Sequence, residues 1–224
     1  MNVKKILLVL AIITLFPLNA YAKKDDIYIP KNFPKKYDKE YVIGILPVYK
    51  SVSKEPVVAV AMDMLVGTNG EFSRNAILGN NLSQRPMKVE FKNLSEIKAD
   101  YANFDALGWK KGKELTIYIN AKHKTAPPGA LAALLSHEAL HQDEYNSIAE
   151  ETYAWTMEAA VWSEILRKYP ESEDDKLIPL VKRENNLKKM FEKGNYSDRY
   201  IKKEIRSNRN YQGLPQTSPG FEDL

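Results

Sequence analysis

The chain has 224 residues, a formal net charge of +4 and no cysteine. This length fits one domain, or a domain with an appended lobe, and 44% hydrophobic with 28% charged residues is typical of a globular protein rather than a disordered or collagen-like one. The lack of cysteine excludes disulfides, thiolate metal sites and cysteine nucleophiles. Lys4 and Lys5 supply two of the net positive charges, so the rest of the chain is too nearly neutral to indicate nucleic-acid binding.

The first 22 residues are typical of a signal peptide. Residues 1–5 are short and basic, residues 6–18 are almost all apolar, and Ala20-Tyr21-Ala22 has the small-x-small pattern of a cleavage site. The apolar run is shorter than the roughly 20 residues that a membrane-spanning helix needs, which disfavours the alternative of an uncleaved anchor. We therefore expect export to the periplasm or the medium, without stable membrane insertion after cleavage.

The segments that follow have mixed patterns. Residues 23–40 are polar and contain two prolines, which predicts an extended leader. Residues 41–49 have a short β-like apolar pattern, whereas the length and the opening proline of residues 56–66 favour a helix. A further short helix is expected within residues 74–82.

Two segments alternate between apolar and polar residues and predict strands. Residues 87–92 are the first, and residues 115–120 are the clearer second, because Leu115, Ile117 and Ile119 alternate with polar residues. The glycines at 108 and 112 are interpreted as punctuation before this strand.

The second half of the chain has the composition of helices. A run of strong helix formers starts at Pro127-Pro128 and continues to Glu144, and after a break at residues 145–147 a second helix is expected at 148–169. Two polar helices, 174–193 and 197–209, follow. We assign residues 41–169 to one domain, 170–211 to a helical C-terminal extension and 212–224 to a loose tail.

Charge is segregated along this half of the chain. Acidic residues dominate residues 136–175 and basic residues dominate 176–211. The simplest interpretation is that the basic helices lie against the acidic ones or are solvated. The alternative is a weak contact between a basic face and anionic envelope polymers.

An H-E-x-x-H motif, His137 to His141, lies in the first of these helices. Residues four apart on a helix share one face, so both imidazoles can reach one ion. Glu138 is then placed to act on a bound water without being a ligand. A catalytic zinc site uses three protein ligands and keeps one open position, so a third ligand is required.

The next helix offers Glu150 and Glu151 as the third ligand. Ser147-x-x-Glu150 has the pattern of a capping box, in which Glu150 bonds back to the start of its own helix. This structural role leaves Glu151, 100° further round the helix, free to face the motif. Glu151 is therefore the favoured ligand.

HEALH followed nine residues later by EETYA resembles the gluzincin branch of the zincin metallopeptidases, especially its small members. The resemblance covers residues 104–162. It implies Zn²⁺ bound by His137, His141 and Glu151, with Glu138 as catalytic base and acid. It also implies a strand before the motif helix that aligns an extended peptide, and residues 115–120 match that position.

Two features depart from the family pattern. Trp155 stands where many gluzincins have an acid that supports a ligand histidine. Glu158, on the same helical face as Glu151, is an alternative for that role, but an exposed salt bridge is the favoured interpretation of Glu158. No histidine follows His141 to hold the transition-state oxyanion. Weak candidates for that role are Tyr145, Tyr153 and His123, of which His123 is expected at the surface.

These observations predict an α+β, zincin-like fold: a small sheet packed on a metal-binding helix pair, with the helical C-terminal extension. The expected function is that of an exported zinc metallopeptidase, which hydrolyses peptide bonds of a peptide or protein substrate with a zinc-bound water and Glu138 as general base. The alternative is a catalytically inactive envelope protein that keeps the fold as a binding or scaffold module.

Cleavage after Ala22 should leave Lys23 as the first residue of the exported protein. Intact-mass measurement on envelope fractions checks this, and a chain that retains Met1 in the membrane pellet would favour the anchor instead.

Overall fold

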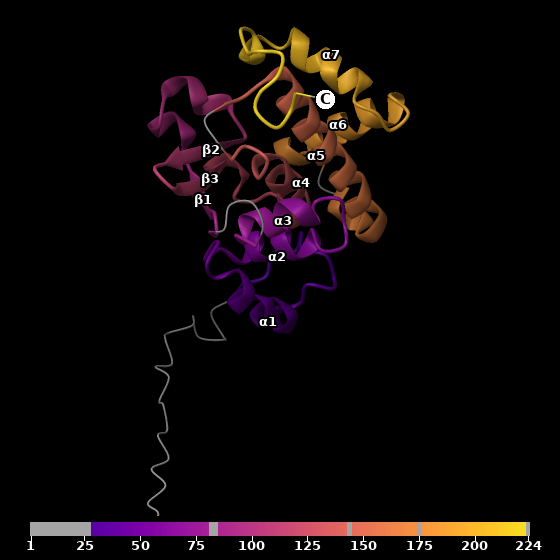
Figure 1. The fold of residues 1–224 in the computed structure, drawn as a ribbon. Helices are drawn as coiled ribbons and strands as arrows, with labels where there is room; N and C mark the ends of the chain where they lie inside the picture. The colour runs from indigo at the N-terminus through magenta and orange to yellow at the C-terminus, as the bar shows by residue number, and fades with distance from the viewer. Residues whose placement is uncertain (1–27, 81–84, 143–144, 174–175, 223–224) are drawn as a thin grey trace, which may run out of the picture.

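The computed structural model describes residues 28–80, 85–142, 145–173 and 176–222. The expected signal peptide therefore lies outside the described residues. Within them the chain forms an α+β fold with a small mixed sheet (Figure 1). Its main elements are α1 (Lys39–Tyr49), α2 (Pro56–Met64), α3 (Glu71–Ile77), β1 (Lys88–Lys92), β2 (Ala106–Lys111), β3 (Glu114–Asn120), α4 (Pro128–Glu138), α5 (Ile148–Lys168), α6 (Pro179–Lys193) and α7 (Arg199–Ser207).

The β-like interpretation of residues 41–49 is wrong, because they form α1. The Asp38 side chain accepts a hydrogen bond from the Tyr41 backbone N–H and caps this helix. The buried residues of α1 are Val42 and Tyr49, seven apart and so on one helical face. Residues 23–27 of the predicted extended leader, 23–40, lie outside the described residues. The rest of it packs on the domain, since Phe33 and Tyr37 are buried in the main core and α1 begins at Lys39.

The other N-terminal predictions fare better. The helix expected at 56–66 is confirmed as α2, which begins at its proline. The short helix expected within 74–82 is α3, which starts earlier, at Glu71, and ends at Ile77. Residues 81 and 82 of that expectation lie outside the described residues.

The sheet has the order β1-β3-β2, with β1 parallel and β2 antiparallel to β3. The two predicted strands are confirmed as β1 and β3, and β2 was missed. Gly108 lies inside β2, and Gly112, with a φ of +62°, forms the turn that joins β2 to β3. β3 is therefore the central strand, not a free edge.

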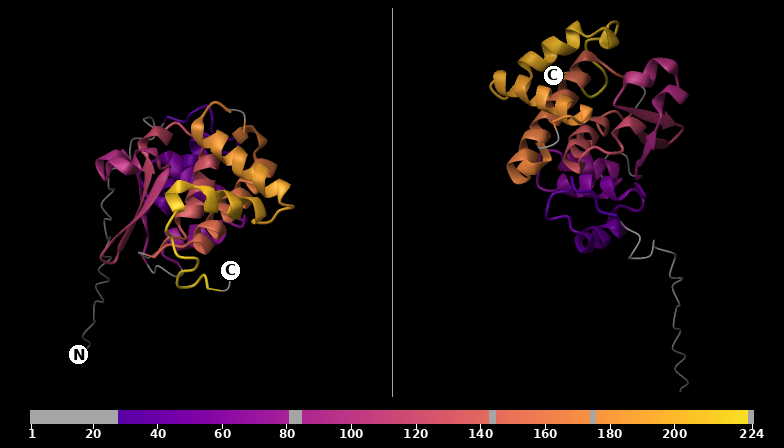
Figure 2. Two further views of the ribbon diagram at one scale, coloured as in Figure 1. Left: turned by 90° about the horizontal axis from the view of Figure 1, so that it is seen from above. Right: turned by 180° about the vertical axis from the view of Figure 1, so that it is seen from behind.

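Helix α4 runs through the centre of the molecule, and all eleven of its residues are buried. It packs against α2 on one side and α5 on the other. Figure 2 shows the sheet on one side of α4 and α5, with α6 and α7 on the opposite side. A helix that is apolar all round is the expected solution for such a position.

The C-terminal helices pack on α5 around a second, smaller core that includes Ile148, Leu187 and Ile205. The predicted helices at 148–169, 174–193 and 197–209 correspond to α5, α6 and α7, although residues 174 and 175 lie outside the described residues. In the described part of the chain, no helix is both long and apolar enough to cross a membrane.

Candidate metal centre

Three side chains meet where the end of α4 faces the start of α5. One ligand atom from each of His137, His141 and Glu151 lies within 4.8 Å of the other two. The two histidine Nε2 atoms are 3.1 Å apart, and each is 3.8 Å from a carboxylate oxygen of Glu151. The residues that the sequence singled out as ligands are thus brought together.

The route of the chain through the motif differs from the expectation. The motif and the residues up to Glu144 were expected to be helical, but α4 ends at Glu138, and residues 143 and 144 lie outside the described residues. Leu140 and His141 continue in a tighter turn, with backbone bonds to the carbonyls of His137 and Glu138. The Gln142 side chain bonds the Ala139 carbonyl at this end. His141 therefore reaches His137 from a turn rather than from a helix.

The donor set fits a zinc ion. Tetrahedral zinc with bonds of 2.0–2.1 Å places its ligand atoms about 3.4 Å apart, close to the separations found here. Glu151 is 4% exposed, and its buried Oε2 has no hydrogen-bond partner among the described residues. A buried carboxylate oxygen without a partner is costly, and a cation between the three side chains would remove that cost.

Each histidine is oriented by a further carboxylate. His137 Nδ1 is 3.1 Å from Glu158 Oε2, and His141 Nδ1 is 2.9 Å from Glu150 Oε1. A bond at Nδ1 fixes the ring and leaves Nε2 directed at the candidate site, as outer carboxylates do in known zinc centres. Burial alone would lower the pKa of His141, but Glu150 and the other nearby carboxylates raise it to about 9.

The capping-box interpretation of Glu150 is only half right. The Ser147 side chain accepts a bond from the Glu150 N–H, as expected. The return bond is not made by Glu150, because the Ser147 N–H donates to Asn146 Oδ1 instead. The Glu150 carboxylate contacts His141, so its role belongs to the site as well as to the helix.

Glu158 is fully buried and not an exposed salt bridge. It contacts His137 on one side and is paired with Arg183 of α6 on the other. Burial raises the pKa of Glu158, but Arg183 and His137 outweigh this and hold it at about 2. Arg183 also contacts Glu184 and Asp105. Arg183 of the basic segment thus pairs with Glu158 of the acidic segment.

Glu138 is 8% exposed and stands between the two histidines in the chain. Burial raises the pKa of its carboxyl, and the neighbouring Glu151 and Glu158 add to this, while His137 and His141 oppose it. It is not one of the three grouped ligand residues. A carboxyl close to the site but outside the ligand set is the arrangement that a general base requires.

None of the weak candidates from the sequence has a contact to the three grouped side chains among those that the structure gives for the described residues. His123 is buried, not at the surface, and bonds Asp105 at 2.7 Å, while Tyr145 and Tyr153 are 56% and 40% exposed. The sequence missed Tyr211, whose ring packs edge-on against Trp155 at 5.9 Å. Burial, together with the nearby Glu151 carboxylate, raises the pKa of Tyr211. No local pattern around Tyr211 could have indicated this position.

Strand β2 passes beside His141. A Cβ built on Gly108 would lie 3.5 Å from the His141 Cβ and from its carbonyl oxygen. Among the described residues β2 pairs only with β3, so its other edge carries unpaired backbone groups. The strand predicted to align a peptide, 115–120, is paired on both sides and cannot do so.

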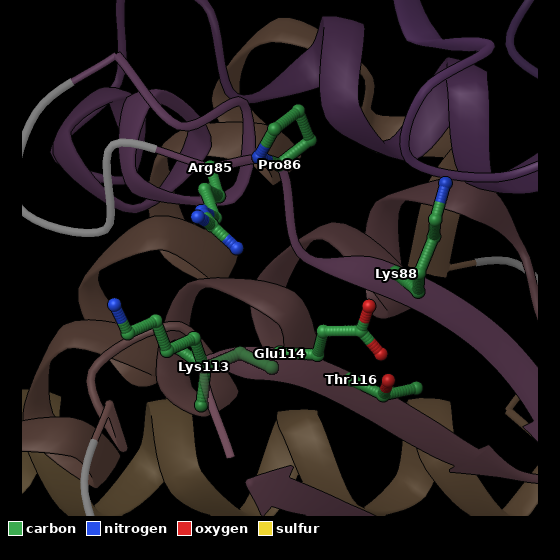
Figure 3. A pocket seen from close by; sticks show the side chains of 7 residues that line it. Arg85, Pro86, Lys88, Lys113, Glu114 and Thr116 are labelled. Carbon is green, nitrogen blue, oxygen red and sulfur yellow. The ribbon is translucent and has the colours of Figure 1, made fainter. Parts of the chain in front are cut away.

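The cavity in Figure 3 is separate from this centre. It has a volume of about 180 Å³ and is lined by residues before and at the start of β1 and β3, among them Arg85, Lys113 and Glu114. None of the three candidate ligands lines it.

No protein-family model, curated protein or solved structure matches the chain. The function proposed for the site therefore rests on its geometry.

Purified protein should bind about one zinc ion per chain, measured by elemental analysis and chelator competition. His141→Ala and Glu151→Ala should lose the ion, since each removes a ligand. Glu150→Ala should weaken binding about 10–100-fold, because it removes only the support of a ligand.

Glu164→Ala is the matched control, because Glu164 lies on α5 but bonds Asn69 instead of the site. Equally low zinc content in wild type and His141→Ala would contradict the assignment.

Proposed function

We propose that the protein is an exported zinc metallopeptidase of the gluzincin type, with His137, His141 and Glu151 as ligands. The observation that carries the proposal is the grouping of these three side chains beside a buried, non-ligand Glu138. A structural zinc closes its fourth position and needs no base. The presence of Glu138 therefore favours a catalytic site over a structural one.

When bound, zinc would polarise the scissile carbonyl and lower the pKa of an attacking water toward about 7. In this proposal Glu138 accepts the proton of that water and passes it to the leaving amine. Glu158 contacts the Nδ1 atom of His137, and Glu150 contacts that of His141, so these carboxylates keep the two imidazoles in place. Tyr211, beside Glu151, replaces Tyr145, Tyr153 and His123 as the candidate donor to the oxyanion.

The free edge of β2 is the proposed guide for the substrate. An extended peptide can add to an exposed strand edge through backbone hydrogen bonds, which tolerate varied side chains. The closeness of Gly108 to His141 would bring such a peptide to the metal ligands. A peptide or protein is therefore the proposed substrate.

Glu138→Gln should keep the zinc content and the melting temperature close to wild type, because it removes no ligand and changes little volume. Peptidase activity on a diverse peptide library should fall by about 10²–10⁴, the usual contribution of general-base catalysis. Glu164→Gln makes the same chemical change on α5, at a carboxylate that bonds Asn69, and should leave activity unaltered. A wild-type protein that holds zinc but cleaves nothing would favour the scaffold alternative.

Proline substitutions at Gly108 and Trp109 test the strand edge. In an antiparallel pair, adjacent residues direct their N–H groups to opposite sides, so one of the two positions faces β3 and the other faces the free edge. Proline at the position that faces β3 should lower the stability of the fold. Proline at the position that faces the free edge should keep the melting temperature but raise KM more than it lowers kcat. Unchanged KM values in that folded variant would exclude this edge as the guide.

A further inference from the structure

We propose that the C-terminal segment, residues 212–222, supports the metal centre. Ser218 is a positioning residue, which holds Glu150 and through it orients His141. The inference rests on the zinc site proposed above. The sequence predicted a loose tail here, and the structure contradicts that prediction, because the segment is bound to the start of α5. In Figure 1 it runs back from α7 towards α5.

Backbone bonds attach the segment first. The carbonyls of Pro215 and Gln216 accept hydrogen bonds of 3.0 Å from the N–H groups of Ile148 and Ala149. The first N–H groups of a helix have no partner within it, so the segment satisfies two donors at the N-terminal end of α5. The same turn of α5 carries Glu150 and Glu151, and the segment therefore fixes the part of the helix that presents the third ligand.

Ser218 then reaches the site through its side chain. Its hydroxyl, in a residue that is 6% exposed, donates to Glu150 Oε2 at 2.8 Å and lies 3.0 Å from the Ser147 hydroxyl. Ser147 Oγ already accepts from the Glu150 N–H, so its own hydrogen is available for Ser218. The other oxygen of Glu150 contacts His141 Nδ1 at 2.9 Å.

Both oxygens of Glu150 are thus engaged, one by Ser218 and one by His141. Without the Ser218 hydroxyl, one carboxylate oxygen would lose its donor in a buried setting, and Glu150 could rotate away from the imidazole. The His141 ring would then lose the contact that directs Nε2 at the candidate metal position. Supporting groups of this kind are worth about 10–100-fold in metal affinity.

Aromatic contacts hold the segment on both sides of these bonds. Phe221 lies 6.0 Å from Tyr153, and Tyr211 lies 5.9 Å from Trp155, as measured between ring centroids. Tyr153 and Trp155 both belong to α5, and Tyr211 directly precedes the segment. The chain is therefore attached to this helix before and after Ser218. This arrangement is the reason to expect a local effect when only the Ser218 hydroxyl is removed.

Ser218→Ala in the full-length protein tests the inference. Zinc affinity, measured by chelator competition, should fall about tenfold or more, and the visible spectrum of the Co²⁺-substituted protein should change because the His141 ligand is less well oriented. The melting temperature of the metal-free protein should change little. Ser218→Thr keeps the hydroxyl and should restore affinity and spectrum.

Ser163→Ala is the matched control, because the Ser163 hydroxyl bonds the carbonyl of Ala159 on the same helix. Wild-type affinity and spectrum in Ser218→Ala, or an equal loss in Ser163→Ala, would overturn the role of Ser218 while leaving the zinc site intact. Failure of the wild type to bind zinc or Co²⁺ would instead overturn the proposed function, and this inference with it.

Discussion

The contact between the end of α4 and the start of α5 is the constraint on which the rest of the structure depends. It buries two imidazoles against the carboxylates of Glu150, Glu151 and Glu158. Ionised carboxylates are expensive to bury unless they are paired or coordinate a metal. Arg183 pairs with Glu158, and His141 with Glu150, but one oxygen of Glu151 has no hydrogen-bond partner within the part of the chain that the structure describes. A cation bound between the three side chains would offset this cost, which supports the proposed metal site.

The C-terminal lobe, which consists of α6, α7 and the segment 212–222, supports this contact. Helix α6 supplies Arg183, which offsets the charge of Glu158 behind His137, and the last segment supplies Ser218, which holds Glu150 behind His141. The two imidazoles are thus supported by two different parts of the lobe. An extension that would otherwise only enlarge the core contributes to the orientation of both proposed ligands.

The sequence predicted that the three proposed ligands would lie together, because the signal is local. The H-E-x-x-H motif places His137 at the end of its helix, and the serine that caps α5 places Glu151 in the first turn of the next one. The connection between the two helices is short, so these side chains meet. Strands β1 and β3 were predicted from alternation for the same reason. What could not be predicted depends on distant parts of the chain, since Ser218 is 68 residues from Glu150. The edge strand β2 was missed because Gly108 within it and Gly112 directly after it were interpreted as loop residues. The helix α1 was missed because a short apolar run fits either a strand or a helix.

X-ray absorption at the zinc edge of the loaded protein tests the central claim most directly. The account predicts a four-coordinate site with two imidazole nitrogens and a carboxylate oxygen, at distances of about 2.0–2.2 Å. One remaining position should be filled by a light, exchangeable ligand. A zinc environment without imidazole, or a six-coordinate shell of oxygen atoms alone, would contradict it.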